Sequence, residues 1–344
     1  MSGNGSLPLS VRFWGVRGSV PAPLTGQEVE DKVAAALCQL RGSSEFRDAS
    51  PERVRELVKV LPFPLRSTFG GNTTCVEVRC GRIPLILDMG TGLRQLGNVL
   101  VKEATRFKPM EGVVLQSHLH WDHIHGFPFW PQVFIPPKCA DVRFRLFGGT
   151  KGGASLEDAL RLQMSPPVFP VSFEVIRQAG MRAEFEAIHD GFESTFGMAH
   201  QPIQVLARKL NHPQDCYGFR IEFCGASLAF TTDHEPFCTN GVPDGLCELV
   251  RNADIWITDC QYSMHEYLGQ SGPPKYGWGH SFPEYIANVA TQAGVRRIVT
   301  THHDPASSDE RIIQLADEVQ QLSLVPTVPA YEGLTLEVGL PRGT

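Results

Sequence analysis

The sequence predicts an α/β protein in which β-sheets are covered by helices. Strand-like and helical segments alternate along most of the chain, with both hairpin-like and strand–helix–strand spacings. The 344 residues are 42% hydrophobic and 20% charged, which is typical of a globular protein. Because no internal repeat and no low-complexity linker divides the chain, we expect a single domain over residues 1–344.

A helical insertion is expected near the N-terminus. Residues 27–41 have helical composition, with apolar side chains close to one face. Ser50 followed by Pro51 is a good helix start, since Ser can cap a helix and Pro fits its first position. Strand chemistry lies on both sides of this pair of helices, so residues 25–66 are predicted to be inserted between two strands.

The remaining elements follow from hydrophobic periodicity and from turn residues. Strands are expected at 10–16, 74–79, 85–88, 113–116, 203–210, 218–223, 227–231, 255–258, 297–301 and 331–338. Further helices are expected to end near Ala104 and to cover 156–164, 246–251, 283–293 and 309–322. Residues 127–170 are rich in Pro, Gly and aromatic side chains, and we expect an irregular insertion over residues 138–200.

Charge and hydropathy argue against several classes of protein. The net charge of -6 and the pI of about 6.1 give no long-range attraction for nucleic acid. Mean hydropathy is -0.13, and no apolar run approaches the roughly 18 residues that cross a bilayer. The N-terminus lacks a secretory pattern, and the nine cysteines include no Cys-x-x-Cys pair. We therefore expect a cytoplasmic protein with reduced thiols and no membrane partner.

The strongest chemical signal is the run His118-Leu119-His120-Trp121-Asp122-His123. It directly follows an apolar strand, and alternate residues of an extended segment point the same way, so His118 and His120 could share a metal ion. A turn near Asp122 could aim Asp122 and His123 at a second ion. Imidazole and carboxylate together suit zinc and similar divalent ions, and four such side chains within six residues argue against ordinary structural histidines.

Further ligands are needed to complete two metal sites, and position along the chain selects three. His212, Asp233 and His302 each follow an expected strand, whereas His189, His200 and His265 lie in less regular sequence. Ligand residues at several strand ends are the pattern expected of a site assembled along one edge of packed sheets.

These residues resemble a known pattern. His118-x-His120-x-Asp122-His123, with His212, Asp233 and His302, resembles the metallo-β-lactamase fold superfamily of binuclear metallohydrolases. The turn Asp88-Met89-Gly90-Thr91-Gly92 is similar to an early Asp-x-Gly-x-Gly turn of that superfamily. The resemblance implies an αββα sandwich with the metals at one edge of its two sheets.

Four further motifs resemble one branch of the superfamily, which contains the phosphoribosyl cyclic phosphate and cyclic nucleotide phosphodiesterases and is related to the tRNA 3′-processing endonucleases. They are Trp14-Gly15-x-Arg17-Gly18-Ser19, Gly70-Gly71-Asn72-Thr73-Thr74-Cys75, Trp278-Gly279-His280-Ser281 and His302-His303-Asp304-Pro305. The resemblance runs from about Val11 to Pro305 and leaves out the helical insertion.

The resemblance implies a role for each ligand. One divalent ion would be held by His118, His120 and His212, and the other by Asp122, His123 and His302, with Asp233 bridging. Zinc is the first choice, with manganese or iron as alternatives. His303 stands beside His302, and His302 is preferred because it directly follows Thr300-Thr301, as in the family pattern.

The same resemblance places catalytic and substrate-binding residues. Two ions about 3.5–4 Å apart can share a water and lower its pKa, which would give a metal-bridging hydroxide. Asp122 could also orient this nucleophile. His280 is expected to protonate the leaving oxygen, because an equivalent His in the related endonucleases is placed at the scissile phosphate. The alternative for His280 is a loop histidine packed against Trp278. Arg17, Asn72, Thr73 and Thr74 are expected to contact substrate, although a Gly-Gly-Asn sequence is also good turn chemistry.

The expected function is therefore phosphodiester hydrolysis of a small cyclic phosphate or cyclic nucleotide. A lactone, β-lactam or thioester hydrolase on the same scaffold is one alternative, an RNA-processing nuclease is another, and a catalytically inactive binding protein is a third. No Lys/Arg-rich arm for tRNA is visible, so no long nucleic acid is expected as a partner. The apolar faces of the insertion favour an active-site cover or a homodimer contact.

Overall fold

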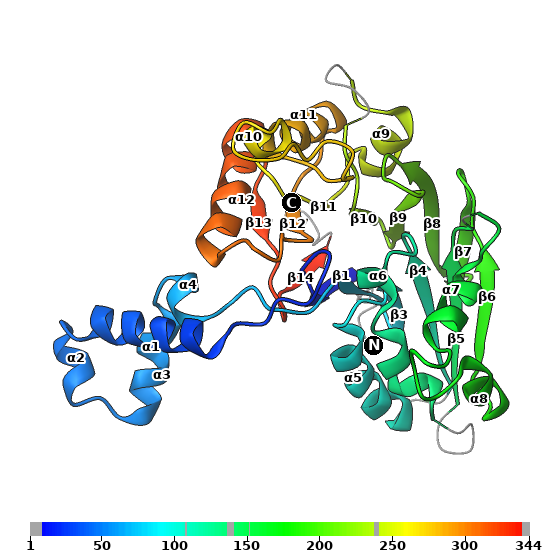
Figure 1. The fold of residues 1–344 in the computed structure, drawn as a ribbon, viewed down its shortest axis with the longest axis horizontal. Coiled ribbons are helices and arrows are strands. Elements are labelled where there is room, and N and C mark those ends of the chain that lie inside the picture. Colours follow the sequence, from blue (N-terminus) through cyan, green and yellow to red (C-terminus); the bar gives the residue numbers. More distant parts are fainter. Residues whose placement is uncertain (1–8, 107–108, 136–140, 151, 237–240, 339–344) are drawn as a thin grey trace, which may run out of the picture.

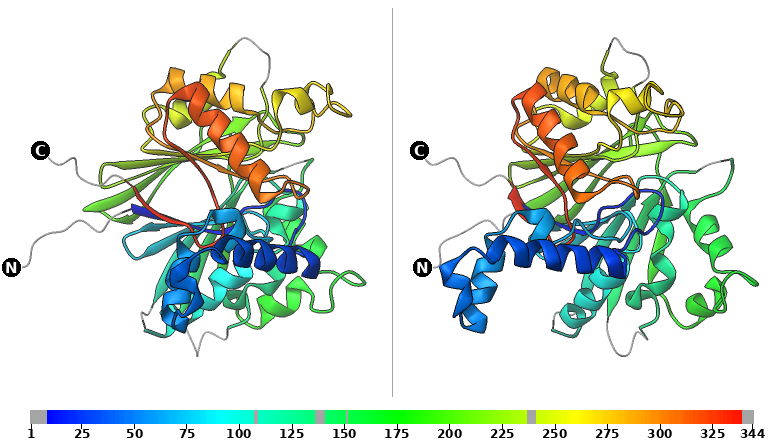
Figure 2. Two further views of the ribbon diagram at one scale, coloured as in Figure 1. Left: turned by 90° about the vertical axis from the view of Figure 1, so that its left-hand side faces the viewer. Right: turned by 60° about the vertical axis from the view of Figure 1, so that its left-hand side comes forward.

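The computed structural model describes residues 9–106, 109–135, 141–150, 152–236 and 241–338. Two seven-stranded sheets pack face to face, and helices lie on the outer face of each (Figure 1). The two turned views show the four layers most clearly (Figure 2). The expected αββα sandwich is confirmed.

The first sheet has the order β14 (Thr335–Val338), β1 (Leu9–Gly15), β2 (Cys75–Cys80), β3 (Ile83–Leu87), β4 (Met110–Gln116), β5 (Val142–Gly148) and β6 (Ala183–Ala187). The second has the order β13 (Thr327–Pro329), β12 (Ile298–Thr301), β11 (Ile255–Asp259), β10 (Ala226–Thr231), β9 (Cys216–Phe223), β8 (Gln201–Leu210) and β7 (Glu193–Met198).

Each sheet contains a parallel half. In the first sheet β3 to β6 are parallel, and in the second β10 to β13 are parallel. The carboxyl ends of parallel strands meet at one edge, and loops at that edge can converge. This topology positions the candidate site.

Apolar side chains from both inner faces form the central core, with Phe13, Phe147, Phe219 and Phe230 among its buried members. The outer face of the first sheet packs against α5 (Leu93–Arg106), α7 (Leu156–Gln163) and α8 (Phe173–Gln178). The second is covered by α9 (Asp244–Val250), α11 (Pro283–Ala293) and α12 (Asp309–Ser323). Short helices α6 (Trp121–Ile124) and α10 (Met264–Tyr267) lie in loops. None of the described helices is long and apolar enough to cross a membrane.

The helical insertion is present and projects from the side of the sandwich (Figure 1). It contains α1 (Gly26–Leu40), α2 (Ser44–Arg47), α3 (Pro51–Lys59) and α4 (Phe63–Arg66). Thr25 and Glu28 form a capping box at α1, and the Ser50 side chain caps α3 as expected.

These helices form a small core of their own around Leu40, Leu57 and Leu61. The insertion is tied to the sandwich by Lys32, whose Nζ lies 2.6 Å from Oδ2 of Asp309. Three other residues of the expected apolar face of α1 point outward instead, since Val29, Val33 and Leu37 are 47%, 54% and 51% exposed.

The expectation of an irregular insertion over residues 138–200 is wrong in the described part of that segment, which contains β5, β6, β7, α7 and α8. β6 and β7 lie at the edges of the two sheets and are largely exposed. Edge strands need few apolar residues, so their sequences, Ala-Glu-Phe-Glu-Ala and Glu-Ser-Thr-Phe-Gly-Met, lack a strong strand signal.

Candidate metal centre

The loop after β4 supplies four of the predicted ligands. His118 and Asp122 are buried, His123 is fully buried and His120 is half-buried. His120 is the N-cap of α6, so the chain changes from extended to helical between His120 and Asp122. That change brings residues from both sides of the bend into one cluster.

The other three predicted ligands arrive from the second sheet. His212 follows β8, Asp233 follows β10 and His302 follows β12. Asp233 and His302 have φ values of 58° and 54°, in the left-handed region. Such strained backbone is common where a side chain must be turned into a functional site.

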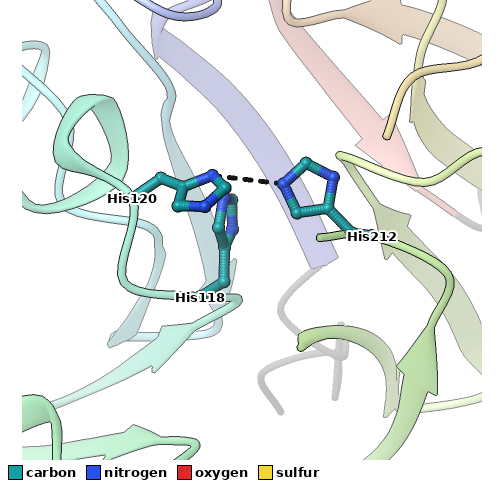
Figure 3. A group of neighbouring side chains, drawn as sticks. All are labelled: His118, His120 and His212. Atoms are coloured by element: carbon teal, nitrogen blue, oxygen red, sulfur yellow. Dashed lines mark hydrogen bonds between the residues drawn. The ribbon is translucent and has the colours of Figure 1, made fainter. Parts of the chain in front are cut away.

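The seven side chains form two adjoining groups. His118, His120 and His212 offer ring nitrogens that lie within 4.8 Å of one another. They approach from two sides, with Nδ1 of His120 3.1 Å from Nε2 of His212 (Figure 3). The second group contains Asp122, His123 and His302.

In the second group, Oδ2 of Asp122 lies 3.1 Å from Nε2 of His302 and 3.3 Å from Nε2 of His123. Asp233 stands between the two groups. Its Oδ1 is 3.2 Å from Nε2 of His302, whereas its Oδ2 is 3.5 Å from Nε2 of His123 and 3.7 Å from Nε2 of His118. This is the bridging position expected from the sequence.

The outward ring nitrogens of four histidines have partners of their own. Nδ1 of His123 lies 2.7 Å from Asp88, and Nδ1 of His118 lies 3.0 Å from Oγ of Ser117. Nδ1 of His212 lies 3.0 Å from the Gly279 carbonyl oxygen, and Nδ1 of His302 lies 3.0 Å from Nε2 of Gln261. Partners of this kind hold metal-binding imidazoles in place.

The inward nitrogens therefore face one another and the two carboxylates. Nε2 of His118 is buried and has no hydrogen-bond partner among the described residues, although a buried polar atom is costly when unpaired. Nitrogen and carboxylate donors at these separations fit zinc and other borderline divalent cations. The residues thus fit the metal centre that the sequence predicts.

The protonation states of His118, His212 and Asp122 favour cation binding. Burial lowers the pKa of His118 well below its ordinary value and that of His212 to about 4. Burial acts to raise the pKa of Asp122, but His123 and His302 outweigh it and hold the carboxyl well below its usual range. Neutral imidazoles and an ionised carboxylate are the forms that bind a metal ion.

His280 lies beside this cluster, with its ring centroid 5.1 Å from that of His302. Its Nδ1 is 3.3 Å from Oδ2 of Asp259, the last residue of β11. Burial lowers the pKa of His280, but Asp259 and Asp233 outweigh it and raise the pKa above the ordinary value. His280 therefore has the surroundings of a proton donor.

Sequence reasoning missed Asp259. This fully buried carboxylate also lies 3.3 Å from His234 and accepts a hydrogen bond of 2.9 Å from the Ser281 amide. It stands at the carboxyl end of a strand between β10 and β12, so the strand-end rule that found Asp233 and His302 could have found it too.

Arg17, expected to contact substrate, is instead bonded within the protein. Its side chain is buried, and it donates to the carbonyl oxygens of Gly70, Asp304 and Ser307 at 2.9–3.1 Å. Burial lowers its pKa from the ordinary value. Arg17 joins three loops beneath the site.

Asn72, Thr73 and Thr74 are likewise committed within the protein rather than presented to a ligand. Asn72 donates from its amide groups to Glu332, and the Thr73 hydroxyl donates to the Asp122 carbonyl at 2.7 Å. Thr73 and Thr74 are fully buried. The residues of the Gly-Gly-Asn-Thr-Thr segment therefore form a turn and pack inside the protein. Through Thr73 the segment also holds the loop that carries Asp122.

The structure distinguishes His302 from His303. Nε2 of His303 lies 2.8 Å from the Ala330 carbonyl, and burial lowers its pKa to about 3. His302 is the member of the pair that faces the cluster, as the sequence predicts.

The Trp14–Ser19 motif shapes the same site. A Cβ on Gly18 would lie 2.5 Å from the His302 ring, so only glycine allows this close approach. The next amide, of Ser19, donates to Oδ2 of Asp122 at 2.7 Å. The motif therefore supports two members of the second metal group.

Comparisons with known proteins agree with this geometry. A family model of a beta-lactamase superfamily domain matches residues 85–303. The chain is 27% identical over 242 residues to an uncharacterized protein of Mycobacterium tuberculosis, covering 68% of this chain and 74% of that one. It is 23% identical over 261 residues to ribonuclease Z of Nostoc, covering 64% and 76%.

Among solved structures, a diphosphatase from the PhnP family superposes with a TM-score of 0.57 and 16% identity, covering 96% of this chain and 98% of that chain. At this identity the likeness shows the fold. The family match spans well over half of the chain and includes every residue of the two metal groups, and on this basis the protein belongs to the beta-lactamase superfamily.

Proposed function

We propose that this protein is a metal-dependent phosphodiesterase that acts on a small cyclic phosphate or cyclic nucleotide. The observation that carries the proposal is the position of Asp233 between two groups of metal-binding side chains, with His280 beside them. A bridging carboxylate and a neighbouring proton donor are what phosphodiester hydrolysis needs from a protein.

Two divalent ions, zinc first, would supply a water of lowered pKa and would neutralise charge on the phosphoryl oxygens. His118, His120 and His212 would hold one, while Asp122, His123 and His302 would hold the other. Asp233 would contact both, consistent with its distances to His302 and His118.

The chain's own residues would then position and move protons. Asp122 is ionised and fixed by the Ser19 amide, so it can accept a hydrogen bond from the attacking water and orient it. The pKa of His280 is raised above its ordinary value, so the ring keeps its proton to a higher pH and can give it to the leaving oxygen. The charge of Asp259, whose Oδ2 lies 3.3 Å from Nδ1 of His280, would stabilise the protonated ring.

An RNA-processing nuclease is the second candidate, and the resemblance to ribonuclease Z favours it. Against it stands the excess of 37 acidic over 31 basic residues, since RNA is gripped mainly through Lys and Arg. No comparable observation favours a lactone, β-lactam or thioester substrate.

The test combines elemental analysis with a substrate screen on freshly purified protein. We expect close to two transition-metal ions per chain and turnover of cyclic mononucleotides or other small cyclic phosphates. Protein that is active with one ion or none would contradict the binuclear proposal. Turnover of lactones or β-lactams alone would contradict the substrate class.

Cytoplasmic localisation and the homodimer stay predictions. Val29, Val33 and Leu37 on α1 are exposed and are the surface through which two chains would meet. Sedimentation would measure whether the protein is a dimer.

A further inference from the structure

The five tryptophans divide into two classes. Three are buried, with at most 6% exposure, namely Trp14, Trp130 and Trp256. The other two, Trp121 and Trp278, are 65% and 52% exposed, and both lie in loops that carry site residues. Exposed indole next to a candidate active site is a feature that the proposed chemistry does not use.

The loop around Trp278 is fixed on both sides of the indole. The amides of Gly277 and Gly279 donate to the Glu235 carboxylate at 2.9 and 3.1 Å. The Gly279 carbonyl is 3.0 Å from Nδ1 of His212, a predicted metal ligand. The backbone on both sides of the exposed Trp278 is therefore fixed by contacts to residues around the candidate metal centre.

A chain of ring contacts joins the indole to the proposed proton donor. Tyr262 packs edge to face against Trp278, with centroids 6.4 Å apart, and against His280, with centroids 6.0 Å apart. Nζ of Lys275 lies 4.0 Å from the Trp278 ring centroid. The indole thus has an ammonium group over its ring and Tyr262 nearly perpendicular to it, while about half of the residue stays open.

We propose that Trp278 is a stacking platform for the nucleobase of the substrate, an inference that rests on the proposed phosphodiesterase function. A flat, half-open indole two residues from His280 would hold an aromatic base while the phosphodiester lies at the metal groups. Stacking of a base on an aromatic side chain changes affinity by roughly 5- to 150-fold. The substrate class is then a mononucleotide ester rather than a sugar phosphate without a base.

The experiment measures binding, so it does not depend on turnover. Adenosine 5′-monophosphate and ribose 5-phosphate are titrated by calorimetry into the metal-loaded protein and its variants. Wild type should bind the nucleotide more tightly than the sugar phosphate. Trp278→Ala should weaken nucleotide binding by roughly 5- to 150-fold and leave ribose 5-phosphate unchanged.

Two further variants separate stacking from general damage to the loop. Trp278→Phe keeps an aromatic ring and should stay within about threefold of wild type in nucleotide affinity. Tyr276→Ala is the matched control, because Tyr276 is an exposed aromatic residue of the same loop, at 66% exposure. This control should bind both ligands as wild type does.

Tryptophan fluorescence gives a second readout. A base stacked on Trp278 should quench part of the wild-type emission, and Trp278→Phe should lose that quenching while it still binds the nucleotide. Equal binding of the two ligands by wild type, an unchanged affinity in Trp278→Ala, or quenching that persists in Trp278→Phe would overturn the inference.

The proposed function fails independently of this inference. Turnover of a base-free ribose cyclic phosphate by wild type tests the phosphodiesterase chemistry without any stacking. Hydrolysis of that compound together with an unaltered nucleotide affinity in Trp278→Ala would remove the platform alone.

Discussion

His123 is hydrogen-bonded through Nδ1 to Oδ2 of Asp88 at 2.7 Å, and neither side chain is exposed to solvent. Asp88 also accepts hydrogen bonds from the amide and hydroxyl of Ser117 at 2.7 and 2.8 Å. Because Nδ1 of His123 is used by the Asp88 carboxylate, Nε2 is the ring nitrogen that is left to bind a metal ion, and it faces Asp122 and Asp233. The early Asp-x-Gly-x-Gly turn therefore acts on the metal centre without joining it.

Replacing Asp88 should weaken metal binding. In Asp88→Asn the amide no longer fixes the tautomer of His123, and loss of such a partner typically costs about 10- to 100-fold in metal affinity. Competition with a graded chelator measures this affinity. Glu111→Gln, an exposed change on the same β4 strand, is the control and should bind metal as wild type does. An unchanged affinity in Asp88→Asn would show that the turn only shapes the backbone.

Removing the central carboxylate should have the larger effect on stoichiometry. Asp233→Ala leaves His302 and His118 without the oxygen atoms that lie 3.2 and 3.7 Å away. We expect fewer than two ions per chain and loss of most activity, with circular dichroism unchanged. Elemental analysis that still finds two ions would remove Asp233 from the bridging position.

The metal centre could be predicted from sequence, whereas the role of Arg17 could not. The ligands show themselves locally, as a six-residue motif and as single residues after the strands that end at Leu210, Thr231 and Thr301. Arg17 is defined by carbonyl oxygens 53 and 290 residues away, at Gly70 and Ser307. An arginine in a Gly-rich loop has the same sequence signature whether it meets a ligand or buried backbone.

The same limit applies to two other features of the sequence. Asn72, Thr73 and Thr74 belong to a loop whose composition suits both turns and ligand contacts, and only the fold shows that their polar groups are already used. Edge strands β6 and β7 have weak apolar patterns because one side faces solvent. The hydrogen bonds of this loop and the edge position of these strands depend on contacts between distant parts of the chain, so a local sequence pattern does not predict them.

His280→Ala should separate metal binding from proton transfer. We expect metal content to stay as in wild type and kcat to fall by roughly 10²- to 10⁴-fold, the usual span for general acid catalysis. The loss should shrink for a p-nitrophenyl ester, since p-nitrophenolate leaves without needing a proton. Steady-state kinetics on good and poor leaving groups checks this. An equal loss on both would assign His280 to substrate positioning.

Arg17→Lys should destabilise the fold. A single ammonium cannot replace the planar guanidinium that bonds to the carbonyls of Gly70, Asp304 and Ser307. Unpaired buried carbonyls cost free energy, and we expect unfolding to become easier by roughly 2–4 kcal/mol. Urea denaturation measures the change. Arg94→Lys, on an exposed position of α5, should leave the midpoint unchanged. An Arg17→Lys protein with wild-type stability and a raised KM would restore a substrate role.

Salt dependence should distinguish a small ester from structured RNA. A protein that grips RNA neutralises several phosphates with Lys and Arg, and its affinity then falls steeply as salt rises. This chain has 31 basic and 37 acidic residues, and Arg17 is buried against backbone carbonyls, so long-range attraction of a polyanion is unfavourable. A small cyclic diester carries little charge and could be held by the metal groups without a basic groove. We therefore expect turnover of cyclic or short nucleotide esters with a KM that changes little with ionic strength, and negligible cleavage of precursor tRNA.

Both substrates should be assayed side by side over a range of salt concentrations. Efficient, salt-sensitive cleavage of the tRNA with no turnover of the cyclic esters would contradict the proposed small-ester phosphodiesterase and would favour an RNA-processing nuclease.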